Sequence, residues 1–200
     1  SKISNEGNYE QVSVLLRNSL SYAGLITIPG FVGGFLLSDR ILQIYGSGFS
    51  RGSEILSILI LSVMFYGFQK QLVNCLAGID RPKEAMKVNV ALIGSNFLLN
   101  WILIIRFDVV GAAIASLLSS AIGTIVGYYI VRQLVRVQIP FRRIGEQATS
   151  AMFMGLIVYT VEEIYILLPY ELPNWIVTSL LVILGASFYF GTLLVFSKSF

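Results

Sequence analysis

Lys70, Gln71 and Asn74 lie in a largely apolar stretch of the sequence, VMFYGFQKQLVNCLAG. In an α-helix, residues three, four or seven positions apart lie on one face, and Gly67 and Gly78 fall on the same side of this stretch. A lysine offers a positive charge, and amide side chains both donate and accept hydrogen bonds. Together these residues could neutralise an anion and hydrogen-bond a polar molecule.

The next apolar segment carries a second polar stripe. Asn89, Asn96 and Asn100 are spaced i, i+7 and i+11, which again places them on one helical face. Polar groups are costly in hydrocarbon, and they usually face the interior of a helix bundle or a water-filled cavity. We therefore take as candidates for the lining of a substrate cavity Lys70, Gln71, Asn74, Asn96 and Asn100.

Each stripe also has a second interpretation. The asparagines could hydrogen-bond between helices, each contributing less than about 2 kcal/mol. Lys70 could instead extend its ammonium group toward the membrane surface or pack against a neighbouring helix. It lies nine residues before Ile79, which corresponds to about 13–15 Å along a helix and places it near the midplane of a hydrocarbon core about 30 Å thick. Both interpretations stay open for both stripes.

The elements that carry these faces are expected to be membrane helices. Of the 200 residues, 56% are hydrophobic and 12% are charged, whereas soluble domains have about 25% charged residues. The apolar runs are continuous, whereas membrane strands would alternate. The sequence therefore predicts an all-α fold, a polytopic membrane helix bundle that forms a single membrane domain over residues 1–200. Its six transmembrane helices are expected at about 18–38, 55–79, 88–105, 109–131, 147–168 and 174–197.

Positive charges indicate the orientation of these helices. When the loops are assigned alternately to the two sides, ten Lys and Arg residues lie on the side of both termini and three lie on the other side. Positively charged loops stay cytoplasmic, so both termini are expected in the cytoplasm of a protein of the cell (plasma) membrane. The basic stretch VRQLVRVQIPFRRIG is expected to contact the headgroups of anionic membrane lipids.

The first predicted helix contains a feature that favours bending, the stretch TIPGFVGG. Pro29 removes one backbone hydrogen bond, and Gly30 adds backbone freedom. These two residues predict a kink and are candidates for a moving hinge. In the fourth predicted helix, the small residues between Ala112 and Gly127 favour close packing against a neighbouring helix.

The composition excludes several kinds of chemistry within this chain. It contains no histidine, so histidine metal sites, Ser-His-Asp triads and histidine general bases are excluded. Cys75 is the single cysteine, so neither an intrachain disulfide nor a Cys-x-x-Cys site can form. The sequence has no GxxxxGK[ST] phosphate-binding loop. We expect no enzymatic activity, no catalytic or metal-binding residues, no cofactor and no nucleic-acid partner.

Five short motifs follow one another over nearly the whole chain: IPG at 28–30, LQIYGSGF at 42–49, GIDRP at 78–82, LLN at 98–100 and VGAAIAS at 110–116. Their order and spacing resemble the C-terminal half of the polysaccharide transporters, which are oligosaccharide flippases of the multidrug/oligosaccharidyl-lipid/polysaccharide exporter superfamily. The string of motifs is more specific than any single one. Because the chain also begins without Met and ends just after an apolar run, we expect a fragment of a longer protein.

This resemblance implies a two-lobed transporter of about twelve to fourteen helices, in which the remaining N-terminal helices of the same protein would be partners of this chain. The family moves lipid-linked oligosaccharide or polysaccharide precursors across the cell membrane by alternating access. The lipid-linked glycan would then be the substrate, with Lys70 near its pyrophosphate or acidic sugar and the amides near sugar hydroxyls.

Three other functions stay open at this point. The first is a drug or cation antiporter of the same superfamily, which would be expected to need an acidic residue deep within a span. The acids that come nearest to this are Glu162 and Glu163, which lie near the end of a predicted helix. The second is a membrane-embedded glycosyl- or acyltransferase, whose site would need carboxylates or histidine at the membrane boundary. The third is an assembly subunit that transports nothing.

Overall fold

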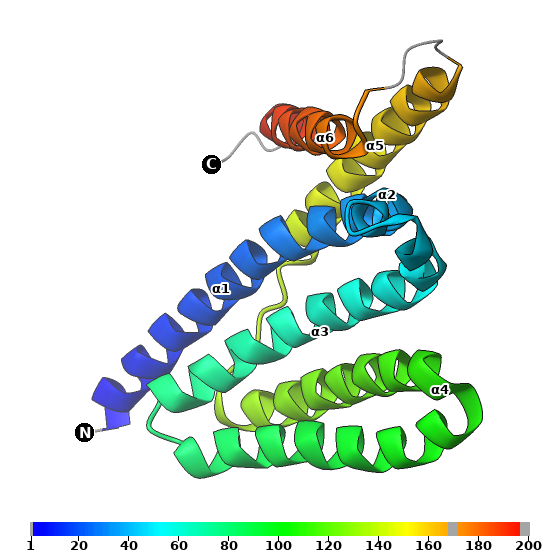
Figure 1. The fold of residues 1–200 in the computed structure, drawn as a ribbon. Coiled ribbons are helices and arrows are strands. Elements are labelled where there is room, and N and C mark those ends of the chain that lie inside the picture. The colour runs from blue at the N-terminus through cyan, green and yellow to red at the C-terminus, as the bar shows by residue number, and fades with distance from the viewer. Residues whose placement is uncertain (1, 168–171, 197–200) are drawn as a thin grey trace. The chain divides into compact units, whose positions relative to one another are not determined.

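A computed structural model of the protein describes residues 2–167 and 172–196, with the side chains of residues 2–9, 47 and 196 left aside. Every regular element in these two ranges is a helix, and none is a strand (Figure 1). The prediction of an all-α fold is therefore confirmed.

Most of the helices are longer than the predicted spans, because polar residues at several ends continue the helical backbone. In chain order, the elements are α1 (Lys2–Leu36), α2 (Ser38–Gln43), the 3-10 helix η1 (Ser47–Gly52), α3 (Ser53–Gly78), α4 (Pro82–Leu134), α5 (Phe141–Ile166) and α6 (Asn174–Phe196). Within the described residues, five helices are long and apolar enough to cross a membrane. The number of spans and their ends in a bilayer stay predictions.

The 53-residue helix α4 consists of two antiparallel arms, and Figure 1 shows it doubling back on itself. The reversal occurs at Asp108, whose backbone angles of φ 52° and ψ −131° are not helical. The arms are bonded where Asn96 Nδ2 donates to Ser119 Oγ at 3.0 Å. The two arms correspond to the third and fourth predicted helices. The helical hydrogen-bond pattern continues up to the turn at Asp108 on both sides.

The turn between α3 and α4 gives the GIDRP motif a structural explanation. Asp80 has a φ of 59°, its N–H bonds the carbonyl of Ala77 at 3.2 Å, and the N–H of Arg81 bonds the carbonyl of Leu76 at 2.9 Å. This is the Schellman pattern that ends many helices. Pro82 then begins α4, where its fixed φ and its missing N–H are favourable. The motif therefore ends α3 and begins α4.

Contacts divide the chain into two compact units. Unit 1 comprises residues 1–24 and 61–141, and unit 2 comprises residues 25–60 and 142–200. Both α1 and α3 therefore pass from one unit into the other within a continuous helix. Whether the two units together form the predicted single membrane domain stays a prediction.

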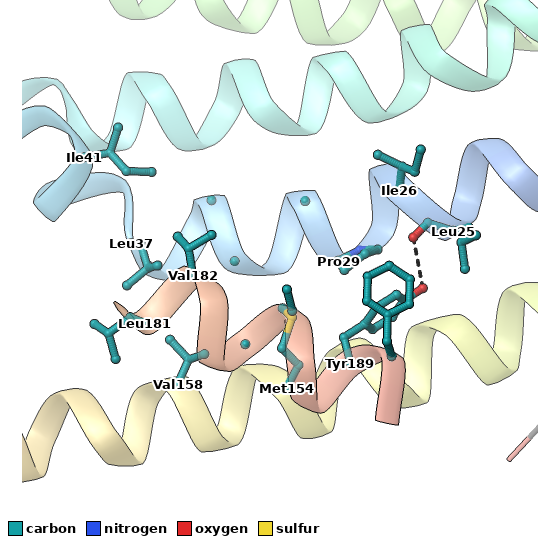
Figure 2. A pocket seen from close by; sticks show the side chains of 16 residues that line it. Leu25, Ile26, Pro29, Leu37, Ile41, Met154, Val158, Leu181, Val182 and Tyr189 are labelled. Carbon is teal, nitrogen blue, oxygen red and sulfur yellow. Dashed lines mark hydrogen bonds between the residues drawn. The ribbon is translucent and has the colours of Figure 1, made fainter. Parts of the chain in front are cut away.

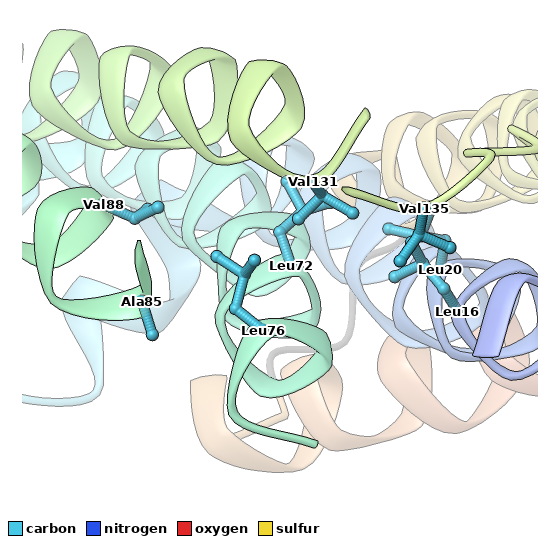
Figure 3. Close-up of a cluster of buried hydrophobic side chains, with 8 residues drawn as sticks. All are labelled: Leu16, Leu20, Leu72, Leu76, Ala85, Val88, Val131 and Val135. Carbon is cyan, nitrogen blue, oxygen red and sulfur yellow. The ribbon is translucent and has the colours of Figure 1, made fainter. Parts of the chain in front are cut away.

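Unit 1 is held together by a cluster of buried aliphatic side chains that come mainly from α1, α3 and both arms of α4 (Figure 3). The cluster consists of Leu16, Leu20, Leu72, Leu76, Ala85, Val88, Val131 and Val135. Gly127 lies beside it, and a Cβ atom there would stand 3.2 Å from Leu72 Cδ1. The small residues of the second α4 arm thus permit the close helix packing that their spacing indicated.

Unit 2 is packed through glycines on α5 and α6. A Cβ atom at Gly155 of α5 would lie 2.9 Å from Val32 Cγ1 of α1, and one at Gly185 of α6 would lie 3.0 Å from Val158 Cγ2 of α5. Contacts of this length leave no room for larger residues. The backbones of α1, α5 and α6 therefore approach one another closely within unit 2.

Large apolar side chains remain exposed along the helices. The exposed fraction is 70% for Trp101, 77% for Ile105 and 69% for Leu194. Soluble monomers rarely expose apolar surface of this extent, whereas a helix in hydrocarbon presents such side chains to lipid. The exposed apolar residues and the five long apolar helices indicate a multi-pass membrane protein.

Candidate functional site

Two of the predicted cavity residues, Gln71 and Asn74, line the same pocket of unit 1. The pocket lies between α1 and α3 and has a volume of about 310 Å³. Its polar side chains are Gln71, Asn74 and Ser19, and its remaining walls are Val12, Leu15, Leu16, Cys75, Gly78 and Ile79. The pocket combines hydrogen-bonding amides and a hydroxyl with an apolar wall, and we call it the α1–α3 pocket.

Lys70 lies on the same helix, four residues before Asn74, but its side chain does not line the α1–α3 pocket. The residue is exposed, and no ion pair or hydrogen bond involves it in the described part of the chain. Its ammonium group is therefore available to an anion that approaches α3 from outside unit 1. The structure does not bury this lysine inside unit 1.

Asn96 and Asn100 lie apart from this pocket, in the first arm of α4. Asn96 bonds Ser119 of the other arm, and Asn100 Nδ2 donates to the carbonyl and the Oδ1 atom of Asn96, both at 2.9 Å. Asn96 also lines a groove of about 290 Å³, together with Ser62, Tyr66 and three serines of α4. Asn96 thus bonds between the two arms of the α4 hairpin, as its second interpretation has it, whereas Asn100 bonds Asn96 of its own arm. Whether either residue lines a substrate cavity stays a prediction.

The buried polar side of α3 was missed by the sequence analysis, which named only the face of Lys70, Gln71 and Asn74 on this helix. Gln69 is 1% exposed and packs against α4, where a Cβ atom at Gly123 would lie 3.2 Å from its amide. Along the same side, Ser62 Oγ donates to the carbonyl of Ser116 at 3.0 Å. Ser62 and Gln69 are seven residues apart, so their spacing was the signal for this second polar side.

The hinge candidates Pro29 and Gly30 line a different pocket, which lies within unit 2 between α1, α5 and α6 (Figure 2). It has a volume of about 380 Å³ and almost purely apolar walls, including Met154, Val158 and Leu181. One polar atom is prominent in Figure 2, the hydroxyl of Tyr189, which donates to the carbonyl of Leu25 at 3.1 Å. This pocket offers few partners for polar ligands.

Charged groups meet in unit 2 at Arg40, which joins α2 to α5 and α6. Its Nε donates to Glu162 Oε1 at 2.5 Å, and its carbonyl accepts a 2.8 Å bond from Asn174 Nδ2. The Arg40 guanidinium also lies 5.5 Å from the ring centroid of Tyr165. The side chains of Arg40 and Glu162 are 14% and 20% exposed, so Glu162 is held in a largely buried ion pair.

The described residues offer no evident metal ligands, since no three His, Cys, Asp or Glu side chains among them lie close enough to share an ion. The polar groups of the α1–α3 pocket and of Lys70 beside it are two amides, a hydroxyl and an ammonium group. Such groups can bind hydroxyl-rich or anionic molecules.

Comparisons with known proteins show which family the chain matches. A family model described as lipid II flippase MurJ matches residues 1–185 of the chain. A "probable flippase AglR" from Haloferax volcanii is 34% identical over 193 residues, which are 95% of this chain and 40% of that protein. A "probable low-salt glycan biosynthesis flippase Agl15" from the same organism is 29% identical over 160 residues, which are 80% of this chain and 34% of that protein.

A solved structure has the same fold. The lipid II flippase MurJ in an inward closed conformation matches with a TM-score of 0.81 and 20% sequence identity, over 98% of this chain and 41% of that one. The chain thus spans about 40% of the length of these proteins. None of these matches supports the expectation that the chain is the C-terminal half of a transporter, which is not retained.

Proposed function

This chain belongs to the lipid II flippase MurJ family, and from that premise we propose that the whole protein translocates lipid-linked glycans across the membrane by alternating access. Family membership, the flippase names of two relatives and the multi-pass helical fold support this function. The activity is assigned to the whole protein, because the chain corresponds to about 40% of such a transporter. It acts as a transporter without a catalytic step of its own.

The α1–α3 pocket is the observation that carries the proposal for the substrate headgroup. It places Gln71, Asn74 and Ser19 in one cavity on apolar helices, and amides and hydroxyls are suitable partners for sugar hydroxyls. Lys70, exposed and unpaired on the same helix, supplies a positive charge to the pyrophosphate or an acidic sugar of the substrate. Asn96 and Asn100 act indirectly, since Asn96 joins the two arms of the α4 hairpin and Asn100 bonds Asn96.

Transport measurements on the full-length protein test these roles. We expect Lys70→Gln to slow the transfer of a lipid-linked glycan across reconstituted vesicles about tenfold or more, because losing a charge-assisted hydrogen bond costs about 1.5–3 kcal/mol. Lys70→Arg should retain most of the rate. Lys83→Gln is the matched control, since it removes an exposed lysine outside the pocket helix. Normal transport by well-expressed Lys70→Gln would overturn the charge role.

Cys75 provides a direct reporter for the pocket. It is the single cysteine of the chain, it is half-buried, and it lines the α1–α3 pocket beside Asn74. A lipid-linked glycan held by Gln71 and Asn74 should slow the alkylation of Cys75 by a water-soluble maleimide, in a full-length variant whose other cysteines are replaced. The protection should disappear in Gln71→Leu/Asn74→Leu. Equal alkylation with and without the substrate would contradict headgroup binding in this pocket.

The remaining assignments complete the proposal. The protein functions in the cell membrane in contact with membrane lipids and with the remaining helices of the same polypeptide, and both ends of this chain face the cytoplasm. The excess of basic residues on the side of the two ends supports this orientation. Reporter fusions at Ile44 and Arg136 test it, because the two positions should lie on opposite sides. Activity of both fusions on the same side would overturn the orientation.

A further inference from the structure

Helix α1 contains a backbone carbonyl that its own helix cannot satisfy. Pro29 lies inside α1, and a proline has no N–H to donate to the carbonyl four residues earlier. That carbonyl belongs to Leu25. In the structure, the hydroxyl of Tyr189 on α6 donates to it at 3.1 Å, as the dashed line in Figure 2 shows. A side chain 164 positions away thus replaces the missing backbone donor.

The surroundings of Tyr189 leave this carbonyl few other donors. Tyr189 is 1% exposed and is one of the largest fully buried side chains of the protein. Its ring packs edge-on against Phe190, with 5.3 Å between the ring centroids, and it lines the apolar pocket of unit 2. A buried carbonyl that loses its partner retains the full cost of its desolvation. The hydroxyl is therefore a specific partner rather than one of many.

The Leu25 carbonyl also lies at the boundary between the two compact units. The division between the two compact units falls between Gly24 and Leu25, so the carbonyl without a helical partner belongs to the first residue of α1 in unit 2. Gly30 follows shortly after, and a Cβ atom there would meet nothing within 4 Å. A helix bends most readily where a hydrogen bond is missing and where side chains do not crowd the inside of the bend.

We propose that Tyr189 is a positioning residue that latches α1 at this point. While the hydroxyl holds the Leu25 carbonyl, α1 is kept from bending beside Pro29. When the bond is released, α1 bends between Leu25 and Gly30, and this bending is a step of the transport cycle. The last clause rests on the proposed transport function, whereas the latch itself is a property of the fold.

A double-mutant cycle in the full-length protein tests the latch. Tyr189→Phe keeps the ring and removes the hydroxyl, and it should lower the melting temperature by roughly 1–3 °C. Pro29→Ala restores an N–H that can bond the Leu25 carbonyl within the helix, so Tyr189→Phe should cost little in the Pro29→Ala background. Tyr22→Phe, which alters an exposed tyrosine of α1, is the control. An equal loss in both backgrounds would overturn the proposal.

Distance measurements test the bending without any substrate. Spin labels on cysteines at exposed Val90 in unit 1 and exposed Val182 in unit 2, with Cys75 replaced by serine, report the separation of the units. Tyr189→Phe should broaden the distance distribution, and Pro29→Ala should narrow it and suppress the effect of Tyr189→Phe. Identical distributions in all variants would overturn the bending. If wild-type protein transports no lipid-linked glycan while these shifts occur, the proposed function fails and the latch stands.

Discussion

Replacing Gly111 with alanine is expected to break the α4 hairpin. Gly111 lies in the VGAAIAS motif, just after the reversal at Asp108. A Cβ atom there would stand 2.2 Å from the carbonyl oxygen of Leu103 and 2.9 Å from the backbone nitrogen of Ile104. These obstructing atoms belong to the backbone of the facing arm, so no side-chain rotation can relieve the clash.

The geometry sets the size of the effect. The gap of 2.2 Å is more than 1 Å short of the 3.4 Å at which ordinary contact begins, so the arms must separate to admit the methyl group. Overpacking a tight contact costs about 1–3 kcal/mol and occasionally more, and a backbone obstruction places Gly111→Ala at the upper end of this range. The separation would also weaken the 3.0 Å bond between Asn96 and Ser119.

Gly94→Ala is the matched control on the same hairpin. A Cβ atom at Gly94 would meet nothing within 4 Å, and alanine in a helix interior is favoured over glycine by about 1 kcal/mol. The two substitutions add the same methyl group and should change stability in opposite directions, by about 3–4 kcal/mol in total. Thermal unfolding of the purified full-length variants in detergent measures this difference.

The result that would refute this reasoning is a melting temperature for Gly111→Ala equal to or above that of Gly94→Ala. It would mean that the arms of α4 are not held as close as the contact between Gly111 and Leu103 requires. A large loss of folded Gly111→Ala on expression, with normal yields of Gly94→Ala, would agree with the prediction.

Three further substitutions follow from the described contacts. Asp108→Gly should raise the stability by about 1 kcal/mol, because glycine adopts a φ of 52° without the strain of a side chain; a lower melting temperature would contradict this. Glu162→Gln should cost about 1–3 kcal/mol by leaving the largely buried Arg40 without its counter-charge, whereas Glu84→Gln, whose partner Lys87 is 62% exposed, should cost under about 0.5 kcal/mol. Equal losses would show that burial does not distinguish the pairs. Leu76→Ala in the unit 1 core should cost about 2–5 kcal/mol, and Leu194→Ala, at an exposed position, should change the melting temperature little.

The helical fold could be predicted because its causes are local. Continuous apolar runs indicate membrane helices, and the predicted helices at 88–105 and 109–131 correspond to the two arms of α4 that join at Asp108. Helical spacing also placed Gln71 and Asn74 on one face, and the structure has both in one pocket. These are relations within one or two helical turns, which the order of residues determines.

Which face of each helix is buried against a neighbouring helix could not be predicted in the same way. Periodicity shows which residues share a side of α3, but it does not show which side meets α4. Gln69, adjacent to Lys70, was therefore missed although it is 1% exposed. Asn96 and Asn100 have the spacing of a cavity stripe, yet Asn96 bonds Ser119 because the second arm of α4 brings it within reach, and Asn100 bonds Asn96. The choice between cavity and packing depends on the neighbouring helix.

Leu25 and Tyr189 show where the two kinds of information meet. The sequence by itself determines that Pro29 leaves the carbonyl of Leu25 without a helical donor, since the missing N–H is a property of proline. Only the tertiary structure decides that Tyr189 supplies the replacement at 3.1 Å. The physical reason is range: a backbone hydrogen bond in a helix joins residues four apart, whereas a side-chain donor from another helix arrives only when packing positions it.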